Sequence, residues 1–152
     1  MVANRIQAEI TQEDQQAVLD ILAEIRERLP FLLNLTAEER QALPKMGEKS
    51  RAFVDEALAL VREDPDLLPA DFEVEELEKD IALYDRLQPI LFAVLQLEDL
   101  LLSTTVAASS DAYSAALAIY ERAQEAGKGE TLAACLAEIE KAAKRSGDTS
   151  SM

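Results

Sequence analysis

The sequence contains no histidine and no tryptophan, and it has only one cysteine, four glycines and five prolines among 152 residues. Without histidine the chain lacks imidazole general bases, the usual partner of a catalytic serine or cysteine, and nearly every zinc, haem or di-iron ligand pattern. A single cysteine, Cys135, cannot form a disulfide within the chain, and we expect it to be a small buried apolar residue. The sequence therefore predicts a non-enzymatic protein with no metal and no cofactor.

Basic residues are also scarce, with 15 Lys and Arg against 30 Asp and Glu and a formal charge of −15. Nucleic acids and anionic membrane surfaces are bound through clustered cations, so neither is an expected partner. The longest weakly charged stretch, residues 87–110, contains Glu98 and Asp99 near its middle, and we do not expect it to span a membrane. The first residues show no apolar stretch followed by a small-residue cleavage site. We expect a soluble, acidic, cytoplasmic protein.

The composition favours helices throughout. Alanine, leucine and glutamate dominate, and no glycine-rich hairpin signal is present, so the predicted fold class is all-α. The length suffices for one core, and we expect a single domain over residues 1–145. The segment 146–152 is small and polar and is predicted to be an unstructured tail, because burial cannot offset the entropy of ordering it.

Caps and apolar periodicity give the bounds of the first helices. One helix is predicted to begin near Thr11 and to end before Pro30. A short connector helix follows, because Thr36 and Glu39 match a capping box and the Leu43-Pro44 step disfavours continuation. A further helix is predicted over about 48–64. Its predicted buried face consists of Phe53, Ala57, Leu60 and Val61.

The second half of the chain is predicted to hold the longest helix. It runs from about Glu73 to Ala108, with a kink at residues 85–89 because Pro89 removes a backbone hydrogen bond. Ser109 or Ser110 is expected to cap the next helix, which the sequence Gly127-Lys128-Gly129 ends. The last helix covers about 130–144. Four long helices and a short connector predict an up-and-down bundle resembling a four-helix bundle.

One stretch carries a resemblance. Residues 29–54 read LPFLLNLTAEERQALPKMGEKSRAFV, about a sixth of the chain. The matching positions are Leu29-Pro30-Phe31-Leu32, Leu35-Thr36, Glu38-Glu39-Arg40, Leu43-Pro44-Lys45-Met46-Gly47, Lys49-Ser50 and Phe53-Val54. This pattern resembles a family of small all-helical bacterial proteins. The resemblance implies a helical bundle and carries no activity to this chain.

The apolar residues between Ile90 and Leu102 are the first functional candidate. They surround the predicted helix on more than one face, which indicates a central helix or one shared with another subunit. We therefore expect an interaction module, for another protein or for a second copy in a homodimer. The predicted contact residues are Ile90, Val94, Leu97 and Leu101.

Two further groups of residues each have a functional and a purely structural interpretation, and the sequence leaves both open. Lys45, Lys49 and Arg51 surround a helix start, where they would bind an anion or a partner. In the alternative interpretation, Lys45 and Lys49 pair with acidic neighbours such as Glu48 or with the first helix. The tyrosines are the alternative candidate, as the lining of a pocket for a small apolar ligand or as aromatic residues at the edge of the core. They are Tyr84, Tyr113 and Tyr120.

Carboxylates offer no further site. The acidic residues between Glu63 and Asp80 lack the glycine and the ligand spacing of a calcium loop, and those near a helix start are stabilised by the helix dipole. Glu98 and Asp99 are adjacent in sequence and point about 100° apart on a helix, so they are not expected to share an acid–base site.

Overall fold

The structure is a computed structural model in which residues 4–148 are described. Within that range the chain is helical and contains no strand, so the predicted all-α class is confirmed. The four-helix bundle stays a prediction. The elements are α1 (Gln12–Arg28), α2 (Ala37–Ala42), α3 (Glu48–Glu63), the 3-10 helix η1 (Pro65–Leu67), α4 (Val74–Glu125) and α5 (Glu130–Asp148).

The described residues divide into two compact units. One unit consists of residues 10–95, and the other combines residues 4–9 with residues 96–148. Helix α4 contributes to both units, so this division does not test the predicted single domain. We refer to them as the 10–95 unit and the 96–148 unit.

Local side-chain signals determine where the first helices begin. The Thr11 hydroxyl accepts a hydrogen bond from the Asp14 amide at 3.0 Å and caps α1. At α2 the predicted capping box forms, because the Glu39 carboxylate accepts from the Thr36 amide at 2.7 Å and the Thr36 hydroxyl accepts from the Glu39 amide at 3.1 Å. The predicted bounds of α1, α2 and α3 are confirmed to within one or two residues.

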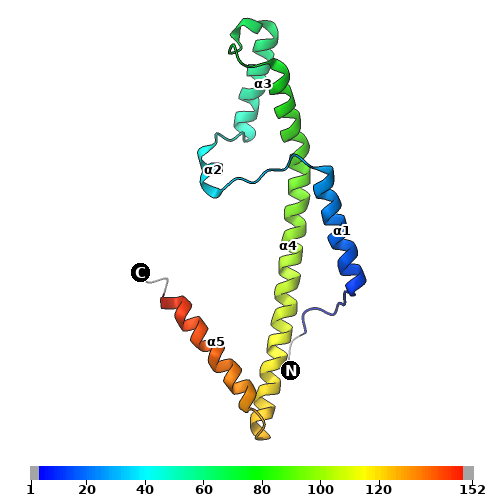
Figure 1. Cartoon of the computed structure of the whole chain (residues 1–152), viewed down its shortest axis with the longest axis vertical. Helices are drawn as coiled ribbons and strands as arrows, with labels where there is room; N and C mark the ends of the chain where they lie inside the picture. Colours follow the sequence, from blue (N-terminus) through cyan, green and yellow to red (C-terminus); the bar gives the residue numbers. More distant parts are fainter. Residues whose placement is uncertain (1–3, 149–152) are drawn as a thin grey trace. The chain divides into compact units, whose positions relative to one another are not determined.

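In the 10–95 unit, α3 packs beside the first turns of α4 (Figure 1). Leu58 of α3 and Ile81 of α4 are the buried apolar residues there, each 9% exposed. Arg62 donates two hydrogen bonds to the Glu78 carboxylate, which joins the two helices at their connected ends. This helix pair is the best-covered part of the described chain.

The predicted buried face of α3 is wrong in part. Phe53 is 76% exposed and Leu60 is 54% exposed, whereas Leu58, which was not predicted, is buried. The covered stripe follows residues 54, 58 and 61, which share one side of the helix at spacings of four and three. Apolar periodicity alone is compatible with burial of either stripe, because α3 carries apolar residues on both.

Helix α4 is longer than predicted. It continues from Val74 to Glu125 without the break expected at Ser109 and Ser110, so that prediction is wrong. No glycine or proline stands between residues 90 and 126, and alanine-rich neighbours let serine and threonine remain helical. Thr104, for example, donates its hydroxyl hydrogen to the Leu100 carbonyl at 2.7 Å. The helix also continues through Pro89, and the kink at residues 85–89 stays a prediction.

The 96–148 unit is organised around the end of α4. Gly127 adopts a positive φ of 68°, and the Lys128 amide donates to the Ala123 carbonyl at 2.8 Å, which terminates the helix as predicted. Helix α5 then continues to Asp148, past the end predicted near residue 144. The rest of the predicted tail, 149–152, lies outside the described residues.

The segment before α1 is anchored in the same unit. The Asp111 carboxylate oxygen Oδ2 accepts from the Arg5 amide at 2.6 Å and from the Ile6 amide at 3.1 Å. The Arg5 guanidinium donates to the Ser110 hydroxyl at 3.3 Å. Ser110 and Asp111 therefore hold residues 5 and 6 against α4, a role that the expected capping by Ser110 did not indicate.

The burial of Leu58 gives a stability prediction. Leu58→Ala should lower the free energy of unfolding by about 2–4 kcal/mol, because it leaves a cavity between α3 and α4. Leu60→Ala removes the same atoms from an exposed position on the same helix and should cost less than about 1 kcal/mol. Urea unfolding followed by circular dichroism measures both. Equal losses for the two variants would contradict the observed packing of α3.

Candidate interaction surface

The predicted contact residues lie on one stripe of α4. Ile90, Val94, Leu97 and Leu101 follow spacings of four, three and four residues, as in a helix-packing seam. All four are exposed, from 40% for Ile90 to 57% for Leu101. Each of the four side chains therefore keeps a large accessible surface.

The exposed apolar surface extends beyond that stripe. Other faces of α4 between residues 90 and 106 also carry uncovered side chains, namely Leu91, Phe92, Leu95, Leu100, Leu102 and Val106. A helix that is apolar on every side normally lies inside a protein core or inside a membrane. The apolar segment of α4, residues 90–106, is therefore the main candidate for intermolecular contact.

By length and composition alone, α4 is apolar enough to cross a membrane. Its most apolar 18-residue window has a mean hydropathy of 1.6, and none of that window is buried. The same segment contains Glu98 and Asp99, neither of which forms an ion pair within the described residues. The expectation that this stretch does not span a membrane stays a prediction.

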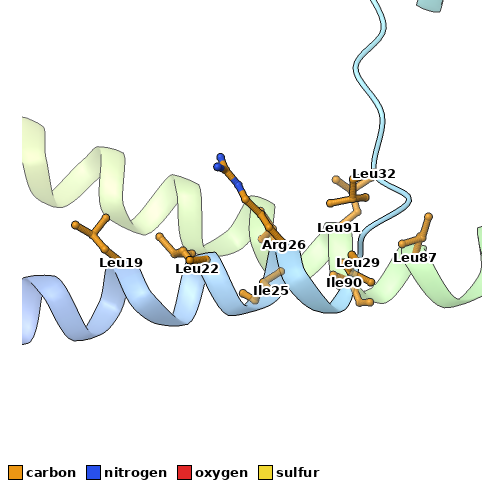
Figure 2. Close-up of a pocket in the computed structure, with 11 residues that line it drawn as sticks. Leu19, Leu22, Ile25, Arg26, Leu29, Leu32, Leu87, Ile90 and Leu91 are labelled. Atoms are coloured by element: carbon orange, nitrogen blue, oxygen red, sulfur yellow. The ribbon is translucent and has the colours of Figure 1, made fainter.

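Inside the 10–95 unit, α1 and α4 border an apolar groove of about 610 Å³ (Figure 2). Residues of α1 line one side of the groove, residues of α4 from Leu87 onward line the other, and Leu32 in the segment after α1 also lines it. The groove is lined by Leu19, Leu22, Ala23, Ile25, Arg26, Leu29, Leu32, Leu87, Ile90, Leu91 and Val94. Two of the predicted contact residues, Ile90 and Val94, thus belong to this groove.

Arg26 is the one charged residue among those that line the groove. Figure 2 shows it between Leu22 and Leu29 along α1. Its neighbour Arg28 pairs with Glu24 at 2.7 Å, but Arg26 forms no ion pair within the described part of the chain. Sequence reasoning did not single out Arg26, because periodicity does not show which neighbour a helix face contacts.

The predicted basic cluster does not act as one group. Arg51 donates to both oxygens of Asp85 at 2.7 and 3.0 Å and to Asp55 at 3.1 Å. These hydrogen bonds, chiefly the one to Asp85, raise the pKa of Arg51. Lys45 donates to the Leu43 carbonyl at 3.2 Å, and no ion pair of Lys49 is seen in the described residues. Arg51 therefore joins α3 to α4. The pairing expected of Lys45 and Lys49 with acidic neighbours stays a prediction.

The three tyrosines do not share a pocket. Tyr84 donates its hydroxyl hydrogen to the Met46 carbonyl at 3.0 Å. Tyr113 and Tyr120 stand about eight and about ten turns further along α4 and line a small groove of about 120 Å³ beside α5. Cys135 also lines that groove and is exposed, so its predicted burial is wrong.

No group of three or more potential metal ligands occurs among residues 4–148. Comparison of the chain with family models, with curated proteins and with solved structures finds no match. The function is therefore argued from the geometry of these surfaces.

The hydroxyl of Tyr84 gives a testable consequence. Tyr84→Phe should lower the free energy of unfolding by about 0.5–1.5 kcal/mol, because the Met46 carbonyl loses its hydrogen-bond donor in a half-buried position. Tyr113→Phe is the matched control, since Tyr113 is 49% exposed and should change stability by less than about 0.5 kcal/mol. Thermal or urea unfolding distinguishes them. A larger loss of stability for Tyr113→Phe than for Tyr84→Phe would contradict the stabilising role of the Tyr84 hydroxyl.

Proposed function

We propose that this chain is a non-enzymatic, self-associating helical module in which a second copy covers the apolar segment of α4. The observation that carries this proposal is the exposure of its ten large apolar side chains, which are each 40–65% exposed. Water in contact with so much apolar surface is unfavourable, so a partner that removes the surface from water is strongly favoured.

The exposed area matches what a stable interface needs. Ten apolar side chains are exposed between Ile90 and Val106. From their exposed fractions, they present on the order of 1,000 Å² of apolar surface, and a standard interface buries about 800 Å² per partner. A second copy presents an identical surface, so a two-fold contact along the stripe of Ile90, Val94, Leu97 and Leu101 buries the same residues on both copies without requiring any other protein.

The sequence predicted a bundle of four helices within one chain, and the proposed association forms a different bundle from two chains. Each copy supplies α1 and the adjoining part of α4, which already border a groove within the 10–95 unit. Two copies together bring four helices into contact. The four-helix bundle is in this proposal an assembly of two chains.

The charges of α4 support a protein contact more than a membrane. Each carboxylate at the centre of a membrane-spanning helix costs roughly 3 kcal/mol by insertion scales, and Glu98 and Asp99 both lie inside the apolar segment. At a protein interface the same groups reach solvent or a cation. A cytoplasmic protein with no nucleic-acid partner is consistent with the charge of −15.

The α1–α4 groove favours a second candidate, the carriage of a small apolar ligand. Ligand sites commonly measure about 300–1,000 Å³ and are lined mostly by apolar side chains, and this groove of about 610 Å³ meets both criteria. A carrier would retain a small molecule in native mass spectrometry, and the extra mass would disappear on unfolding. A bare protein would leave self-association as the role of this surface.

Substitution of the contact stripe tests the self-association. Leu97→Glu or Leu101→Glu should raise the dissociation constant of the dimer by roughly 30-fold or more, because a carboxylate would be buried without a partner. Size-exclusion chromatography with light scattering reports the mass, and circular dichroism reports the helix content, which should stay unchanged because both side chains are exposed.

The matched control is Leu33→Glu, at an apolar residue that is 76% exposed and lies outside α4. This variant should keep the mass of the wild-type protein. If Leu97→Glu and Leu101→Glu also keep that mass while remaining folded, the apolar segment is not a contact between copies.

A further inference from the structure

We infer that the second copy docks antiparallel along α4 and pairs its Glu98 with Arg26 at the α1–α4 groove. This inference rests on the proposed self-association and specifies its orientation and its polar contact. Three observations carry it: the spacing of the contact stripe, the lining of the groove, and the charges of Arg26 and Glu98, neither of which forms an ion pair within the described residues.

The contact stripe has the same spacing in both directions. Ile90, Val94, Leu97 and Leu101 are separated by four, three and four residues. A two-fold axis between residues 95 and 96 therefore places Ile90 opposite Leu101 of the second copy, and Val94 opposite Leu97 of the second copy. Every apolar residue of the stripe meets another apolar residue, as antiparallel helix packing requires.

This register brings one carboxylate to the groove. Glu98 follows Leu91 by seven residues, so the two lie on the same side of α4. In the antiparallel pair, Leu91 lies level with residue 100 of the second copy, and Glu98 of that copy is then only about 3 Å away along the helix axis. Leu91 lines the groove together with Arg26.

The charges select this orientation. Arg26 and Glu98 both lack an ion pair within the described residues, and each lies among apolar side chains that association would cover. Covering either charge alone is unfavourable, whereas covering them as a pair offsets much of that cost. A parallel pair would place each residue level with its own counterpart, and Glu98 would then lie about two turns from Arg26.

A charge-exchange experiment on the full chain tests the pairing. Arg26→Glu and Glu98→Arg should each raise the dissociation constant of the dimer about tenfold, and the double variant should return to within about threefold of wild type. Analytical ultracentrifugation over a concentration series measures these constants. Both residues are exposed in the single chain, and circular dichroism checks that the variants keep their helix content.

Two neighbouring substitutions serve as controls. Arg28→Glu changes the net charge as Arg26→Glu does, but it lies at a pair that is largely exposed and should leave the dimer unchanged. Residue 99 points about 100° away from Glu98 on the helix. Asp99→Arg combined with Arg26→Glu should therefore not restore the association of the dimer.

The outcomes separate the two proposals. If Leu97→Glu dissociates the dimer but the double variant is no tighter than Arg26→Glu alone, the antiparallel pairing is wrong and self-association stands. If Arg26→Glu behaves like Arg28→Glu, the pairing is likewise wrong. A wild-type protein that is monomeric throughout the concentration series overturns the proposed function itself.

Discussion

Helix α4 carries more apolar surface than the other described elements cover. Of the large apolar side chains in the described range, 30 are exposed, and ten of these lie between Ile90 and Val106. The single chain buries Leu58 and Ile81, both in the 10–95 unit. Because burial of apolar surface is the dominant favourable contribution to folding, the association that we propose would stabilise the helix by covering this surplus.

Polar groups define the bounds and the local pairing of the helices. The capping hydroxyls of Thr11 and Thr36 begin α1 and α2, and Gly127 ends α4. Arg51 connects α3 to α4 through Asp85. These contacts are exposed and individually weak, so they select which helices are neighbours while contributing modestly to stability. The larger contribution to stability, from burial of apolar surface, would come from the interface that we propose.

Features that depend on neighbouring residues were predictable from the sequence. The capping box at Thr36, the start of α1 at Thr11 and the break at Gly127 follow from local chemistry, and the structure confirms them. Features that depend on which helices contact each other could not be predicted from the sequence. The exposure of Phe53 and the groove beside Arg26 result from tertiary placement, which apolar periodicity does not encode.

Native mass spectrometry of the unaltered protein tests most directly whether a second copy covers α4. The subunit has a mass of 16.7 kDa, and the proposal predicts a species of twice that mass without any retained small molecule. The double mass should persist at low micromolar protein, because the two apolar segments are buried together. A bare monomer at every concentration would contradict self-association and leave the apolar surface of α4 for a different partner.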